Sequence, residues 1–196
     1  MRSVGGGTVR TYNVGYLIGS LSSTSINRIL ARVLIKISPP DLKFTEIPIR
    51  GLPLFSPDYD VDFPPEVIDF KRAIATVDAL LFVTPEYNRS IPGGLKNAID
   101  WASRPRHENS FNHIPAAVIG CSPGSIGPAL AQQSLRAVLG FCNARQMTAP
   151  EAYVRYSPEI YTPDGDITDD SARSFLTGYM AELRDHIVRT LTVLPR

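Results

Sequence analysis

The sequence predicts an α/β fold in which a parallel sheet carries helices on both faces. Short apolar strands alternate with amphipathic helices about five times along the 196 residues. One segment, 79–83, is apolar without a break, as expected for a strand that is covered on both faces. The chain has no internal repeat and no low-complexity tract. We therefore expect a single domain over residues 12–196, preceded by a flexible, glycine-rich lead at 1–11.

The first half of the chain supplies two strand–helix units. We expect strands at 12–18 and 42–47, and helices at 25–37 and from the two prolines at 64–65 onward, since proline fits the first turn of a helix. The first helix has an apolar stripe at helical spacing, formed by Ile26, Ile29, Leu30, Val33, Leu34 and Ile37. Serine and threonine at 23–25 can cap its start, and the prolines at 39–40 end it.

The second half continues the alternation. Strands are expected at 78–84, 115–121 and 146–149, and helices at 95–103, 128–139 and 171–191. The segment 153–169, with turn signals at Pro163-Asp164-Gly165, is predicted to be an excursion outside the sheet.

Composition excludes several classes of function. Twenty Lys and Arg against 19 Asp and Glu give a net charge of +1, which argues against a nucleic-acid binder. No apolar run approaches the ~20 residues of a membrane helix. The two cysteines are too few for a disulfide framework, and the three histidines lack metal-ligand spacing. The N-terminus lacks the apolar run of a signal peptide, so we expect a cytoplasmic protein without a metal.

Ligands of such sheets bind beyond the carboxyl ends of the strands, which directs attention to three loops. The first, 19–27, leads from a strand into a helix, where backbone N–H groups and the helix dipole attract phosphate. Ser20, Ser25 and Asn27 could add hydrogen bonds. The loop has no Gly-x-Gly-x-x-Gly or Gly-Lys-Ser/Thr pattern, and a plain Ser/Thr-rich helix cap is the alternative interpretation.

The second and third loops could enclose a flat ligand. Loop 84–94 has prolines that hold its backbone, glycines that permit close approach, and Tyr87 as a stacking surface. Its alternative is a rigid connection with Tyr87 at a protein interface. Loop 122–128 could form the opposite wall, and Cys121 before it is expected to be a buried, inert thiol. Arg104, Arg106 and His107 form a small basic cluster, either a solvated helix end or a contact for the phosphates of a nicotinamide cofactor.

The second loop carries a resemblance to a known family. Thr84-Pro85-Glu86-Tyr87-Asn88, followed by the run from Ser90-Ile91-Pro92-Gly93-Gly94 to Trp101, resembles the signature of NAD(P)H-dependent FMN reductases, and in particular the chromate and quinone reductases. Gly19-Ser20-Leu21 resembles the phosphate loop of that family, and Ser122-Pro123-Gly124 resembles its third flavin loop. The resemblance implies a flavodoxin-like, three-layer fold with a five-stranded parallel sheet.

The resemblance also implies a cofactor and its contacts. Non-covalent FMN would be held by Gly19, Ser20, Ser25, Ile26 and Asn27 in the first loop, by Pro85, Glu86, Tyr87, Asn88 and Ser90 in the second, and by Ser122, Pro123 and Gly124 in the third. NADPH or NADH would supply electrons. Family members form homodimers, often assembled into tetramers, and the helix at 96–101 would lie in the dimer interface. No side chain is assigned a catalytic role, because the flavin carries the chemistry.

The chain departs from the family pattern at two positions. Ser22 stands where the family often has arginine, which removes a charge-assisted contact to phosphate unless Arg28 replaces it. Leu130 stands where chromate-reductase relatives often have an arginine of an inter-subunit network, which would leave Glu151 without its usual partner.

The expected function is an FMN-dependent NAD(P)H oxidoreductase. Hydride would pass through flavin N5 to quinones, free flavin, azo compounds or metal oxyanions. One alternative is a flavodoxin-like electron carrier that does not oxidise NAD(P)H directly, although flavodoxins are usually strongly acidic and this chain is not. A second alternative is a degenerate relative that serves as a binding protein.

Overall fold

The computed structural model describes residues 10–194, so most of the lead expected at 1–11 lies outside the described residues. Its sheet has the strand order β2-β1-β3-β4-β5, and every strand pair is parallel. The strands are β1 (Tyr12–Ile18), β2 (Leu42–Glu46), β3 (Ala79–Val83), β4 (Pro115–Ser122) and β5 (Arg145–Gln146). This is the flavodoxin-like order, in which the chain reverses direction across the sheet between β1 and β3.

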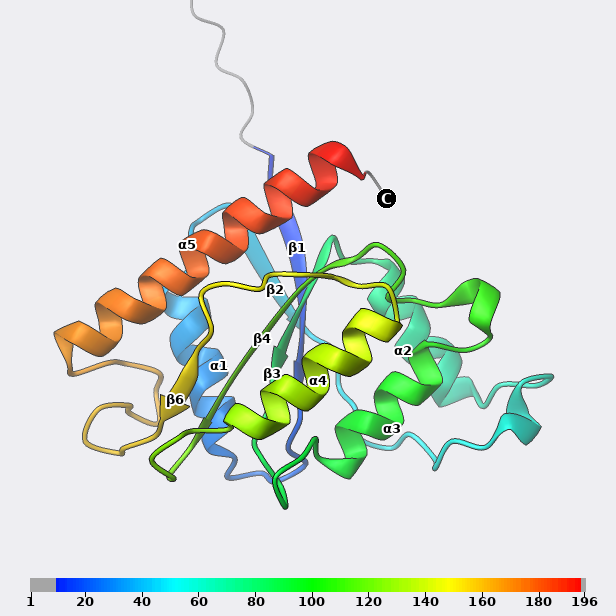
Figure 1. The fold of residues 1–196 in the computed structure, drawn as a ribbon, viewed down its shortest axis with the longest axis horizontal. Helices are drawn as coiled ribbons and strands as arrows, with labels where there is room; N and C mark the ends of the chain where they lie inside the picture. The colour runs from blue at the N-terminus through cyan, green and yellow to red at the C-terminus, as the bar shows by residue number, and fades with distance from the viewer. Residues whose placement is uncertain (1–9, 195–196) are drawn as a thin grey trace, which may run out of the picture.

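Helices cover both faces of the sheet (Figure 1). They are α1 (Ile26–Ile37), α2 (Pro65–Ala75), α3 (Gly93–Ala102), α4 (Ala129–Phe141) and α5 (Asp170–Val193), with short 3-10 turns at Pro57–Tyr59 and Arg106–Glu108. One core cluster joins α1 and α5 to the sheet, and a second joins α2, α3 and α4 to the opposite face. β3 serves both clusters, since Leu81 belongs to the first and Phe82 to the second. The expected three layers are confirmed.

The fifth strand differs from the expectation. β5 is shorter than 146–149, and a further strand, β6 (Tyr153–Arg155), pairs in parallel with the carboxyl half of β4. The prediction that 153–169 lies wholly outside the sheet is therefore wrong for its first three residues. Pro150 has no N–H to donate to a ladder, so regular pairing stops before it and resumes at Tyr153.

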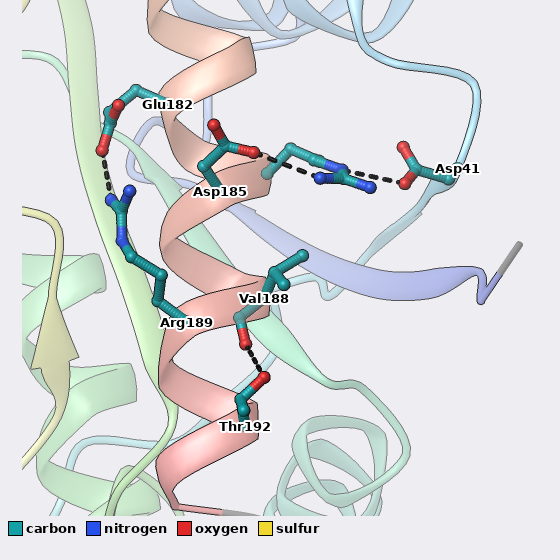
Figure 2. Close-up of polar contacts among 7 residues, drawn as sticks. Asp41, Glu182, Asp185, Val188, Arg189 and Thr192 are labelled. Atoms are coloured by element: carbon teal, nitrogen blue, oxygen red, sulfur yellow. Dashed lines mark hydrogen bonds and ion pairs between the residues drawn. The ribbon is translucent and has the colours of Figure 1, made fainter.

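Helix α5 closes the first layer. Its Tyr179 hydroxyl donates to the Val118 carbonyl of β4 at 3.0 Å, deep in the core. Arg184 of α5 donates to the largely buried carboxylate of Asp41, just before β2, at 2.9 Å, and Figure 2 shows this link beside the other contacts along α5. In the described part of the chain no helix has an apolar stretch long enough to cross a membrane.

Candidate functional site

The three loops singled out by sequence meet at the carboxyl ends of β1, β3 and β4. The Ser20 Oγ and the Tyr87 hydroxyl lie 3.1 Å apart, which joins the first loop to the second. A pocket of about 270 Å³ lies between all three loops. It is lined by Ser20, Ser22, Thr24, Ser25, Ile26, Asn27, Pro85, Glu86, Tyr87, Cys121, Ser122 and Pro123. Most of the predicted site residues are thus brought together.

The floor of this pocket is the N-terminus of α1. Ser25 occupies the N-cap position, but its side chain makes no capping hydrogen bond, and the first turn has no acidic residue. Ser20 and Ser25 are buried at 5% and 7% exposure, with Ser25 at the helix start. The first N–H groups of a helix have no partner within it, and they carry the positive end of the helix dipole. This end of α1 is therefore suited to an anion.

Asn27 joins the start of α1 to the end of β4 behind the pocket. Its fully buried amide donates to the Cys121 carbonyl at 3.0 Å and accepts from the Cys121 N–H at 2.9 Å. These two bonds fix the end of β4 against α1. With its side chain engaged in this way, the backbone N–H is the group that Asn27 can direct to a phosphate.

The second loop is a two-residue hairpin. Tyr87 and Ser90 exchange backbone hydrogen bonds of 3.2 and 3.0 Å, and Asn88 and Arg89 between them have φ of 50° and 61°. Two consecutive left-handed residues are the mark of a type I′ turn. The sequence analysis missed this hairpin, although Asn88 is a residue that tolerates the left-handed region. The hairpin leaves Tyr87 half-exposed at 48%.

Glu86 fastens this hairpin to α4. Its Oε2 accepts from the N–H groups of Leu130 and Ala131 at 2.9 and 3.1 Å, and its Oε1 lies 3.0 Å from the Arg89 guanidinium. The Glu86 side chain is only 8% exposed. Because both oxygens are occupied, Glu86 offers a bound ligand its backbone rather than its charge.

The third loop forms the far wall of a second, adjoining pocket. Ser122 Oγ accepts from the Gly124 N–H at 3.1 Å, which tightens the turn. The pocket, of about 480 Å³, is lined by Glu86, Asn88, Arg89, Ser122, Gly124, Ser125, Ile126 and Gly127. It shares Glu86 and Ser122 with the first pocket. Together the two can hold an elongated ligand with an anionic end and a wider end.

Glycine permits a close approach at a different place from the one expected. Gly93 and Gly94 belong to the first turn of α3, where a Cβ on Gly93 would meet nothing within 4 Å. A Cβ on Gly19 would instead lie 2.9 Å from Thr84 Oγ1, which is too close. Gly19 therefore allows the first loop to lie against the end of β3.

Several other predicted groups lie outside these pockets or are already paired. Arg104, at the far end of α3, stacks on the Phe55 ring and lies 3.8 Å from Asp60. Arg28 is bonded to Glu46 at 2.7 Å. Glu151, which was expected to lack its usual inter-subunit arginine, accepts from Gln133 of its own chain at 2.7 Å.

The expected character of Cys121 is confirmed. The thiol is 1% exposed, and burial raises its pKa to about 12, so it is protonated and unreactive at neutral pH. Within residues 10–194 no three His, Cys, Asp or Glu side chains cluster in a way that could hold a metal ion.

Comparison with known proteins places the chain in a family. Residues 12–159 match the NADPH-dependent FMN reductase family. The chain is 44% identical to a 2-hydroxy-1,4-benzoquinone reductase of Burkholderia, over 85% of this chain and 91% of that protein. It is 41% identical to an NAD(P)H-dependent FMN reductase of Pseudomonas aeruginosa, over 85% and 90%.

A solved structure agrees with this assignment. The flavoenzyme FerB of Paracoccus denitrificans, an NAD(P)H:(acceptor) oxidoreductase, superposes with a TM-score of 0.88 at 43% identity, covering 92% of this chain and 99% of that one. The matched residues 12–159 include all three loops of the site. The chain is therefore a member of the NADPH-dependent FMN reductase family.

Proposed function

We propose that the protein is an FMN-dependent NAD(P)H oxidoreductase whose principal acceptors are quinones, with free flavin, azo compounds and metal oxyanions as further acceptors. The observation that carries the proposal is the uncapped N-terminus of α1, which lines one pocket with the second loop, the loop that bears the family signature. Quinone and FMN reductases among the relatives support the choice of acceptor.

The residues present fit FMN. The uncapped start of α1 and the hydroxyls of Ser20 and Ser25 match the phosphate. The backbone of 85–88 and of 122–124, with the Tyr87 ring, matches the polar edge and the face of the isoalloxazine. When bound, FMN would supply hydride acceptance at N5 and transfer of electrons to the acceptor, while the protein supplies position and electrostatics.

The chain's own residues hold the loops of the site in place and orient the acceptor. Glu86 and the Asn88-Arg89 turn keep the second loop rigid, and Asn27 keeps the third loop in register with the first. Tyr87 shapes the acceptor side of the site, where its half-exposed ring can contact a planar quinone. The carboxylate of Glu86 does not serve as an acid or base, because α4 and Arg89 occupy both of its oxygens.

The proposal includes a homodimer and a cytoplasmic location. Leu54 and Phe141, 84% and 87% exposed, supply apolar surface near α3 and the end of α4 for a second copy. Trp101 is fully buried and donates to the Pro53 carbonyl at 2.7 Å, so it would support such an interface from within its own chain. The two buried free thiols suit a reducing compartment.

The test is a spectrum of the purified protein with FMN, followed by anaerobic addition of NADPH or NADH. Bleaching of the flavin absorbance near ~450 nm, then reoxidation by a benzoquinone, is the expected result, because the bound cofactor does the chemistry. Bound flavin that neither nucleotide reduces would support the electron-carrier alternative. Failure to bind FMN would support the binding-protein alternative.

A further inference from the structure

The pocket at the start of α1 lacks a basic side chain. None of its lining residues is Lys or Arg, and Ser22 among them is uncharged. The Ser22 hydroxyl is used within the loop, where it accepts from the Thr24 N–H at 3.2 Å. A phosphate with up to two negative charges would meet helix dipole and hydroxyls alone, and charged hydrogen bonds are about twice as strong as neutral ones.

Arg28 is poorly placed to supply the missing charge. Its guanidinium donates to Glu46 at 2.7 Å, with both side chains about one-third exposed. The pair is close to neutral as a unit. Moving Arg28 to a phosphate would leave the Glu46 carboxylate without this partner.

Arg50 reaches the first loop from a different part of the chain. Its guanidinium donates to the Leu21 carbonyl, between Ser20 and Ser22. Within residues 10–194 it forms no ion pair, whereas Glu46 of the same pocket is paired with Arg28. A guanidinium has five N–H donors, and this contact accounts for one of them.

The fold holds Arg50 in this position. The preceding Ile47 and Ile49 are buried, at 1% and 6% exposure, and Gly51 turns the chain away with φ of +85°. Arg50 lines a pocket of about 390 Å³ that also borders the first loop. That pocket shares Ser20 and Ser22 with the pocket at the start of α1.

We propose that Arg50 is the cationic residue of the phosphate site. The inference rests on the proposed function, since it assigns the residue that recognises the phosphate of FMN. It makes Arg50 a specificity-determining residue that distinguishes FMN from riboflavin, which has the same ring and ribityl chain but no phosphate.

The main test measures flavin binding, and KM values for NADPH and NADH are measured for the same variants. Kd values for FMN and for riboflavin are obtained from flavin fluorescence with apoprotein of the wild type and of Arg50→Gln. We expect Arg50→Gln to raise the Kd of FMN about 10-fold or more and to leave the Kd of riboflavin unchanged, as for loss of one charge-assisted bond. Arg50→Lys should recover part of the loss, and Ser22→Arg added to Arg50→Gln should recover most of it.

Arg32→Gln is the matched control. Arg32 is also exposed and also donates to one backbone carbonyl, that of Pro163 at 2.9 Å, but it lines neither pocket. It should leave both Kd values unchanged.

Three results would overturn the inference. Equal weakening of FMN and riboflavin would show that Arg50 only supports the loop. An unchanged FMN Kd would show that it contributes nothing to the phosphate site. An unchanged FMN Kd with a raised KM for NADPH but not for NADH would assign Arg50 to the 2′-phosphate of the nucleotide. Failure of the wild type to bind FMN would refute the proposed function itself.

Discussion

Two helices begin beside the candidate site. The N-terminus of α4 is capped by a side chain, and the N-terminus of α1 is not. At α4 the carboxylate of Glu86, from a loop more than 40 residues earlier, accepts from two backbone N–H groups. At α1 the N-cap Ser25 makes no capping bond, and the first turn carries no acid. Both ends carry the same partial positive charge. The difference indicates which of the two is left for a ligand and which serves the scaffold.

Placing a carboxylate at the N-terminus of α1 should produce the largest change in FMN affinity. Ser25→Asp places a carboxylate at the N-cap, where it can accept the helix's own N–H groups and repel a phosphate. We expect FMN affinity to fall about 100-fold or more, from loss of the dipole contact and from like-charge repulsion. The apoprotein should be stabilised by about 0.5–1 kcal/mol, because a helix end gains a cap.

Fluorescence titration and urea unfolding of the same apoprotein preparations give the two quantities. Ser25→Ala is the control, since it removes one hydroxyl without adding charge and should weaken FMN far less. Tight FMN binding by Ser25→Asp would mean that the phosphate does not sit at α1.

Removing the Glu86 cap from the N-terminus of α4 should mainly lower the stability of the protein. Glu86→Ala leaves two N–H groups of α4 without their acceptor and frees the hairpin, so we expect the free energy of unfolding to fall by about 2–3 kcal/mol. Glu86→Gln keeps the shape and one acceptor oxygen and should recover part of this loss. Urea unfolding of the apoproteins measures both, and an unchanged midpoint in Glu86→Ala would show that the cap is not needed.

Asn27 tests how the start of α1 is held against the end of β4. Asn27→Ala removes both bonds to the Cys121 backbone and should lower the free energy of unfolding by about 2 kcal/mol. The end of β4 should loosen with it, so Cys121 should react faster with a thiol reagent at pH 8. In the wild type its pKa of about 12 keeps the thiol protonated at that pH.

Cys142→Ala, combined with each form, confines the labelling signal to Cys121. A Cys121 that stays equally unreactive in Asn27→Ala would show that the clamp does not hold β4.

The smallest effect is expected at the contact between the two loops. Tyr87→Phe removes the 3.1 Å contact between the half-exposed Tyr87 and Ser20. It should change the free energy of unfolding by no more than about 1 kcal/mol. Tyr87→Ala removes the ring as well and should alter turnover of at least one quinone. Unchanged turnover of every acceptor by Tyr87→Ala would refute the role proposed for the ring.

The sequence predicted the parts of this arrangement that depend on local pattern. Uninterrupted apolar strands and helical stripes determined the layers, and the Gly19-Ser20-Leu21 and Pro85-Glu86-Tyr87-Asn88 segments located the loops through a family resemblance. The bonds of Asn27 to Cys121 and of Glu86 to Leu130 join residues 94 and 44 positions apart. No periodicity records such pairs, because they form only when strands and helices are already packed.

Local sequence patterns did not predict two elements, the hairpin at 87–90 and the strand at 153–155. Asn88 favours a left-handed turn but Arg89 does not, so the hairpin at 87–90 was not apparent from composition. The strand at Tyr153–Arg155 was hidden because it is only three residues long and follows Pro150.

The divided edge strand also has a consequence for solubility. A long, straight edge strand offers another chain a row of unpaired N–H and C=O groups, and so promotes aggregation. Beside β4 this edge consists of β5, with two residues, and β6, with three, separated by a stretch that contains Pro150. Neither piece is long enough to template a foreign strand. The interruption therefore protects this side of the sheet from intermolecular pairing while the carboxyl end of β4 stays braced beside the site.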